Sequence, residues 1–193
     1  MRVLVVHAHP MENSFNASLF RMTVARLKEK DHKVDVIDLY RDGFDPVMSH
    51  DERAAYHDTV ENRKPVEDYV TRLLAAEALV LVYPVWNFGY PAILKGWFDR
   101  VFLPGVSFGL VNGKVQPTLH NIRKILVVTS YGGSRFRAWL MGDPPRKIAT
   151  RMLRATVKPG ASVKYLAHYE MNLSTIATRH AFMSRVEAAL DRI

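Results

Sequence analysis

The chain has 193 residues, of which 48% are hydrophobic and 24% charged, and it contains no cysteine. This length suits one domain around a single core, so we expect residues 1–193 to form one domain. The lack of cysteine excludes disulfide scaffolds, thiolate zinc sites, iron–sulfur clusters and cysteine nucleophiles, and it favours a cytoplasmic location.

The formal net charge of +8 favours anionic ligands. The basic residues are scattered and match no nucleic-acid-binding motif, so we expect no nucleic-acid partner. No stretch approaches the ~20 apolar residues of a membrane span, so we also expect no transmembrane segment.

Short apolar segments alternate with longer amphipathic ones, the pattern of strands joined by helical crossovers. In chain order, the predicted elements are a strand at Arg2–Val6, a helix at Ser14–Lys30, a strand at Lys33–Leu39, a short helix at Asp51–Asn62, a helix beginning at Pro65, a strand at Ala78–Tyr83, a helix from Pro91 to Phe102, a hairpin within Gly105–Pro117 that turns at Asn112-Gly113, a strand at Lys124–Thr129, a helical turn at Phe136–Met141, a helix at Lys147–Thr156, a strand at Ser162–His168 and a helix at Thr175–Arg192.

This order predicts an α/β fold, a flavodoxin-like three-layer sandwich with a five-stranded parallel sheet of order 2-1-3-4-5, because right-handed crossovers leave few other packings. Such sheets bind ligands beyond the carboxyl ends of their strands. The loops His7–Phe15, Pro84–Tyr90 and Ser130–Arg135 are therefore the candidate site.

Several catalytic motifs fail on their context. The first turn has no glycine, which excludes a dinucleotide fingerprint there. The segment Gly105-Val-Ser107-Phe-Gly109 matches the nucleophile elbow of serine hydrolases, with Asp143 and His168 or His180 downstream, but it follows a predicted helix instead of a strand. We keep a serine hydrolase as a minor alternative. His7 and His9 have no nearby carboxylate, so no metal site is predicted.

The loops themselves suit a flat, phosphorylated ligand. The polar turn from His9 to Asn16 places hydroxyl, amide and imidazole groups at a helix start, although an ordinary N-cap is the simpler reading of that turn. Tyr83–Pro91 carries four aromatic rings, which suit a planar ligand or else seal the core or a subunit contact. Gly132-Gly133 allows close approach of the backbone to a ligand, and it is also a common turn.

At this point the sequence resembles the flavodoxin-like NAD(P)H:quinone oxidoreductases, the DT-diaphorase group with its bacterial relatives. The matching segments are VLVVHAHPMENSFNASL at 3–19, DLYRDGFDPV at 38–47, ALVLVYPVWNFGYPAILKGWFDRVF at 78–102 and ILVVTSYGG at 125–133. The resemblance implies a bound flavin, FAD by the likeness at Asn13–Asn16 or else FMN. It also implies NAD(P)H as hydride donor, a quinone-like acceptor, a ping-pong reaction and a homodimer.

Residue by residue, the resemblance places the flavin phosphates and ring on three sets of residues. The cofactor-binding residues it implies are His9, Ser14, Phe15 and Asn16, then Pro84, Val85, Trp86, Asn87 and Phe88, and then Thr129, Ser130, Tyr131, Gly132 and Gly133. We assign the catalytic role to Tyr131, whose segment offers backbone N–H groups to a negatively charged reduced flavin. A flavin-binding regulatory subunit of a membrane transporter is the second hypothesis.

Overall fold

Five buried apolar segments form the central sheet. In the computed structural model, which describes residues 1–193, they are β1 (Arg2–His7), β2 (Lys33–Asp38), β3 (Ala78–Val85), β6 (Lys124–Tyr131) and β7 (Ser162–His168). All neighbouring strands are parallel, which confirms the predicted five-stranded parallel sheet, and they lie in the order β2-β1-β3-β6-β7. The predicted order 2-1-3-4-5 counted only parallel strands. The observed numbering also includes an antiparallel hairpin, β4 (Phe108–Val111) with β5 (Lys114–Pro117).

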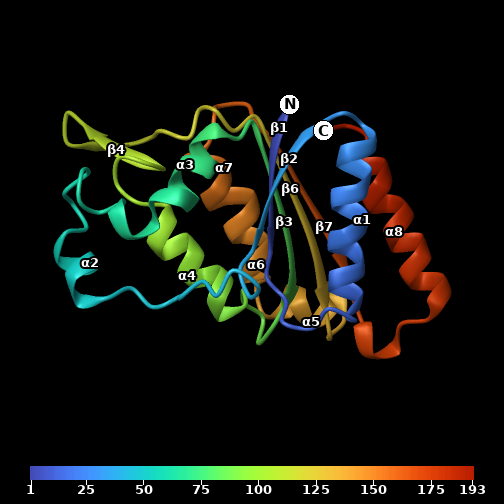
Figure 1. Ribbon diagram of the computed structural model, residues 1–193. Helices are drawn as coiled ribbons and strands as arrows, with labels where there is room; N and C mark the ends of the chain where they lie inside the picture. The colour runs from blue at the N-terminus through green and yellow to red at the C-terminus, as the bar shows by residue number, and fades with distance from the viewer.

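Helices cover both faces of this sheet, as Figure 1 shows. One face carries α1 (Phe15–Glu29) and α8 (Ile176–Leu190), which pack against each other. The other face carries α3 (Glu67–Ala75), α4 (Ala92–Val101), α6 (Pro144–Lys147), the π-helical turn η2 (Ile148–Leu153) and α7 (Arg154–Thr156). The remaining elements are short: α2 (His50–Ala54), η1 (Lys64–Val66), α5 (Arg135–Leu140) and η3 (Met171–Leu173).

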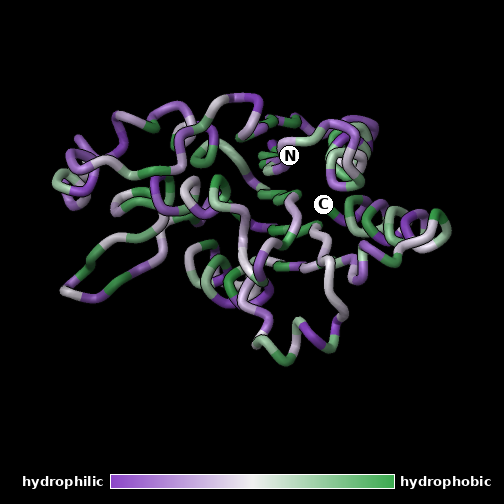
Figure 2. The backbone as a smooth tube through the Cα atoms, turned by 90° about the horizontal axis from the view of Figure 1, so that it is seen from below, coloured by the Kyte–Doolittle hydropathy of each residue, from purple (hydrophilic) through white to green (hydrophobic).

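The alternation of side chains along each strand divides the core into two layers. In β1, Val3 and Val5 face α1 and α8, whereas Leu4 and Val6 face the layer that contains Trp97 of α4. All four β1 side chains are buried, as are those of β3. Figure 2, seen from below, shows these strand segments as hydrophobic stretches in the middle of the molecule. No helix is both long enough and apolar enough to cross a membrane.

Two predicted helices differ from the structure. The helix predicted at Asp51–Asn62 is only His50–Ala54, because the Asp58 carboxylate accepts hydrogen bonds from the N–H groups of Val60 and Glu61 and stabilises a turn there. The helix predicted at Lys147–Thr156 begins earlier, at Pro144, and contains the η2 turn. Pro144 follows Asp143, whose φ of 45° ends the preceding segment.

Two central strands run further toward the candidate site than predicted. The sequence places a loop at Pro84, but β3 continues to Val85 and pairs with β6 as far as Tyr131. Pro84 is tolerated because β1 ends opposite Val82, so no strand needs a backbone N–H on that side of β3. The hairpin turn is confirmed, with left-handed backbone at Asn112 (φ 51°) and Gly113 (φ 73°).

Candidate active site

The loop after β1 is a compact turn that leads directly into α1. The Ser14 side chain caps this helix by accepting a hydrogen bond from the N–H of Ala17 at 3.0 Å. His9 Nδ1 accepts from the N–H of Met11 at 3.0 Å, which leaves the proton of a neutral ring on Nε2, free to donate. Burial, and then the neighbouring His7, lower the pKa of His9, so the neutral form is favoured.

The start of α1 holds polar groups that have no partner in the protein. The backbone N–H groups of Phe15 and Asn16 donate no hydrogen bond. The Asn16 side chain is 3% exposed, and neither its amide oxygen nor its amide nitrogen has a hydrogen-bond partner. Because buried polar groups are almost always paired, an orphaned amide beside two free N–H groups marks a site for a hydrogen-bonding ligand. The helix N-terminus favours an anionic one.

His7, the last residue of β1, is fixed by contacts that the sequence does not reveal. Its Nδ1 lies 3.1 Å from the Asp38 carboxylate at the end of β2, and its ring stacks on Phe20 of α1 at 4.3 Å between centroids. Burial lowers the pKa of His7, although Asp38 partly offsets this. His7 Nδ1 therefore has a partner within the protein, whereas its Nε2 is buried without one.

The loop after β3 is a tight turn between Trp86 and Gly89, whose backbones exchange two hydrogen bonds. Asn87 and Phe88 both have left-handed backbone, with φ of 49° and 57°. This conformation is uncommon for a bulky residue such as Phe88 and often marks a functional segment. The N–H groups of Asn87 and Phe88 donate no hydrogen bond within the protein. They are therefore available to a ligand.

The first two loops lie against each other through their rings. Trp86 is 41% exposed, and its ring centroid lies 5.9 Å from that of His9. The N–H of Ala8 donates to the carbonyl of Val82, which ties the start of the first loop to β3. The predicted proximity of the two loops is thus seen in the structure.

The third loop begins where β6 ends and lies beside the second. Pro84 pairs in register with Ser130, and the Thr129 hydroxyl donates to the Tyr83 carbonyl at 2.6 Å. The N–H groups of Gly132 and Gly133 donate no hydrogen bond, whereas the Gly133 carbonyl accepts one from Glu170. A Cβ at Gly132 would meet nothing closer than Asn172 at 3.8 Å. The fold itself therefore has room for a side chain at Gly132.

Tyr131 is the centre of a buried cluster that sequence reasoning missed. Its hydroxyl donates to Asp143 Oδ1 at 2.6 Å and lies 2.6 Å from the Tyr165 hydroxyl, and its ring packs on Tyr169. Burial, followed by these hydroxyl and carboxylate neighbours, raises the pKa of Tyr131 far above its ordinary value. Tyr131 is therefore protonated, and its ring is 2% exposed. Its side chain points into the core, and its backbone leads into Gly132.

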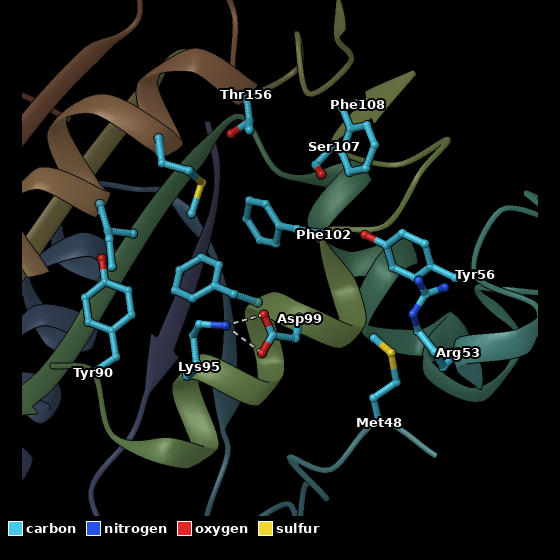
Figure 3. Close-up of a pocket in the computed structure, with 13 residues that line it drawn as sticks. Met48, Arg53, Tyr56, Tyr90, Lys95, Asp99, Phe102, Ser107, Phe108 and Thr156 are labelled. Atoms are coloured by element: carbon cyan, nitrogen blue, oxygen red, sulfur yellow. Dashed lines mark hydrogen bonds and ion pairs between the residues drawn. The ribbon is translucent and has the colours of Figure 1, made fainter. Parts of the chain in front are cut away.

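A cavity of about 830 Å³ lies on the α4 face of the molecule. Figure 3 shows its lining: Phe102 and the Lys95–Asp99 ion pair of α4 lie between Tyr90 on one side and Met48, Arg53 and Tyr56 on the other. Tyr90 belongs to the loop after β3, so the cavity adjoins the candidate site through this residue. The other lining residues come from the α2 region, the hairpin and the η2–α7 segment.

The serine-hydrolase alternative is not supported by the geometry. Ser107 lies between α4 and β4, is 1% exposed, and its hydroxyl has no hydrogen-bond partner. Asp143 instead accepts from Tyr131, and His168 packs edge-on against Phe15. No hydrogen bond joins any two of these three candidates. A nucleophile elbow also requires a strand before the serine, where this chain has a helix.

The fold defines a flavodoxin-like protein, and its three neighbouring loops form a candidate site at the carboxyl ends of β1, β3 and β6. A protein family described as having the flavodoxin-like fold matches residues 1–177. The chain belongs to this family, and its relatives include proteins named NAD(P)H dehydrogenase (quinone) 1.

Three similar proteins illustrate the relationship. The chain is 31% identical to human ribosyldihydronicotinamide dehydrogenase (quinone) over 72% of each chain. It is 34% identical to the Escherichia coli uncharacterized NAD(P)H oxidoreductase YcaK over 56% of each. A solved structure of the NAD(P)H:quinone oxidoreductase from Methanothermobacter marburgensis superposes with a TM-score of 0.85 at 25% identity, covering 98% of this chain and 97% of the other. The chain spans about half the length of several curated relatives it matches.

Proposed function

We propose that the protein is a flavin-dependent NAD(P)H oxidoreductase that reduces quinones or similar acceptors by two-electron transfer, and that residues 1–193 act as one domain. The observation that carries this proposal is the set of unpaired donors on three adjacent loops. The N–H groups of residues 15, 16, 87, 88, 132 and 133 are all free, and the buried Asn16 amide has no partner. The relatives named as quinone dehydrogenases support the same activity.

The residues at the start of α1 fit the phosphate end of a flavin. Two free N–H groups and the helix dipole favour an anion there. Asn16 would add an amide donor, and His9 would add an Nε2–H donor. Ser14 fixes the helix start, since its hydroxyl already accepts from Ala17. Both FAD and FMN carry phosphate that could lie at the start of α1. We propose FAD as the cofactor because of the likeness at Asn13–Asn16, with FMN as the alternative.

The other two loops fit the ring system. Trp86, Asn87 and Phe88 would line one edge together with Pro84 and Val85. Thr129 to Gly133 would line the other, where the glycines let the backbone come close. A bound flavin would supply the hydride-transfer chemistry between NAD(P)H and the acceptor, so the chain's task is to position the rings and exclude water.

Tyr131 is proposed to act through its backbone. Its ring is held by Asp143, Tyr165 and Tyr169, which fixes the direction in which the chain enters Gly132 and Gly133. The free N–H groups of the two glycines would then stabilise negative charge in a water-poor site. Because the Tyr131 hydroxyl is already hydrogen-bonded to Asp143 and Tyr165, we assign it no proton transfer.

We also propose a homodimer, as the resemblance implies. Helix α5 exposes Phe136 and Leu140 by 66% and 65%, two large apolar side chains on one short helix. The largely apolar cavity along α4 is a second surface that a partner copy would cover. Sedimentation of the purified protein tests this proposal, because a monomer at all concentrations would contradict it.

The decisive experiment loads purified protein with FAD or FMN and measures NAD(P)H oxidation with a water-soluble quinone. We expect stoichiometric flavin binding and quinone-dependent turnover with parallel-line kinetics. Asn16→Ala should lower flavin retention. Protein that binds neither flavin, or that oxidises no NAD(P)H, would overturn the proposal.

A further inference from the structure

Four cations without an ion-pair partner line one pocket of the chain. Elsewhere many arginines are paired: Arg72 with Asp35, Arg63 with Glu67 and Arg100 with Glu52. A pocket of about 360 Å³ between α5 and the α6–η2 segment differs, because four cations line it and none of them has an ion-pair partner. These side chains, which we call the basic pocket, are Arg135, Arg146, Lys147 and Arg151.

The fold brings these cations together from three consecutive elements. Arg135 is the first residue of α5, Arg146 and Lys147 belong to α6, and Arg151 belongs to η2. Two left-handed residues, Gly142 (φ 79°) and Asp143 (φ 45°), make the turn that folds α6 back toward α5. A non-glycine residue in this conformation costs conformational energy, so the turn is maintained by the surrounding contacts.

One carboxylate, that of Asp143, also lines the basic pocket, and it already accepts a hydrogen bond. Asp143 Oδ1 accepts the Tyr131 hydroxyl at 2.6 Å. Four cations therefore face a single engaged carboxylate, and the pocket retains an excess of positive charge. Tyr169 lines the same pocket, and Arg146 lies 5.8 Å from the ring centroid of Tyr165. The guanidinium of Arg146 is thus held by an aromatic face instead of by an acid.

The position of the basic pocket selects its ligand. Arg135 follows Gly133 by two residues, so the pocket adjoins the loop proposed to hold the flavin ring. It is not the proposed flavin-phosphate site, which lies at α1 on the opposite face of the sheet. Trp139 lines the pocket and is 70% exposed, which provides a flat apolar surface beside the cations. Cations beside an exposed indole suit a phosphorylated nucleoside with a planar base.

We propose that the basic pocket binds the 2′-phosphate of NADPH, with the adenine against Trp139, and that the protein uses NADPH in preference to NADH. This inference rests on the proposed function. Arginine is suited to this role because its planar guanidinium donates paired hydrogen bonds to phosphate oxygens. NADH has a hydroxyl at the same position and would leave the cations unpaired.

The test compares the double variant Arg135→Gln/Arg151→Gln with Arg154→Gln. Arg135 and Arg151 are exposed and make no hydrogen bond through their side chains, so both changes should leave the fold intact. Arg154 is exposed on α7, three residues after Arg151, and does not line the pocket. We expect the wild type to favour NADPH in kcat/KM by about tenfold or more, the effect of one or two charge-assisted hydrogen bonds. The double variant should lose this preference through KM for NADPH, with NADH kinetics unchanged.

Calorimetry provides a readout that needs no turnover. Flavin-loaded wild-type protein should bind adenosine 2′,5′-bisphosphate about tenfold more tightly than adenosine 5′-monophosphate, and the double variant should bind both equally. Equal use of NADH and NADPH by an active wild type would overturn the inference while leaving the proposed function intact. Binding of inorganic phosphate as tight as that of the bisphosphate would also overturn it. Loss of preference in Arg154→Gln would show a general charge effect and contradict the assignment.

Discussion

Asn16 gives a prediction that separates stability from function. Its side chain is buried and both amide atoms lack partners. A buried unpaired polar group costs about 1 to 3 kcal/mol, and leucine has the same number and branching of side-chain heavy atoms and a higher helix propensity. Asn16→Leu should therefore raise the free energy of unfolding of flavin-free protein by about 1 to 2 kcal/mol. For a chain of this size, each kcal/mol raises Tm by about 2 to 4 °C.

The same variant should lose its advantage when flavin is present. Flavin at a hundredfold excess over Kd stabilises the wild type by about 2.7 kcal/mol, whereas Asn16→Leu binds weakly and gains little. The wild type should therefore have the higher Tm with flavin, and Asn16→Leu the higher Tm without it. Thr23→Val is the matched control, because Thr23 is also buried and unpartnered in α1 but lies two turns further along the helix. It should be stabilised in both conditions.

Two results would refute this reasoning. If Asn16→Leu binds flavin as tightly as the wild type, the amide does not contact the cofactor. If it destabilises the flavin-free protein while Thr23→Val does not, the Asn16 amide is satisfied within the fold and its lack of a partner is no sign of a ligand.

Three further predictions follow from single contacts. Gly132→Val should leave Tm unchanged, because the fold has space there, but should reduce flavin binding at least tenfold in a fluorescence titration. The control Gly109→Val in the hairpin should not reduce flavin binding. Equal effects of the two variants would remove the reason to place flavin at Gly132. Gly96→Ala should lower the free energy of unfolding by about 1 to 3 kcal/mol in urea, because its Cβ would lie 2.3 Å from the Pro46 carbonyl; a neutral result would mean that this close packing relaxes freely. Glu52→Gln should cost about 3 kcal/mol at pH 7, because it leaves the largely buried Arg100 without a charged partner.

The pH dependence of the Glu52 effect follows from its pKa. Burial raises this pKa, but hydrogen bonds from Ser49 and Arg100 outweigh burial and hold it below the ordinary 4.5. The stability that Glu52 contributes is therefore present above pH 4.5 and is lost as the pH falls through the lower, folded-state pKa. Urea unfolding of the wild type and Glu52→Gln should converge in this acidic range. A constant difference between them at all pH values would show that the ion pair does not cause the effect.

Much of the fold was predictable because its signals are local. The strand at Ser162–His168 and the turn at Asn112-Gly113 follow from an apolar run and from two residues suited to left-handed backbone. The short α2 was predicted too long, since the competing turn at Asp58 depends on side-chain hydrogen bonds that periodicity does not report. The extension of β3 through Pro84 was missed because it depends on where a neighbouring strand ends.

The site was predictable as three loops but not as a set of contacts. Buried strands with parallel pairing place the loops at one edge of the sheet, and this follows from topology. Contacts such as that of Tyr131 with Tyr165, or of His7 with Asp38, join residues more than 30 positions apart and leave no local pattern. The left-handed backbone of Phe88 was also unpredictable, because phenylalanine disfavours it.

A crystal structure of the flavin-loaded protein would test the central claim most directly. We predict electron density for a phosphate at the N–H groups of Phe15 and Asn16, and for a flat ring between Trp86 and the Gly132–Gly133 turn. Flavin density in the cavity along α4 instead, with the three loops unchanged, would contradict the account.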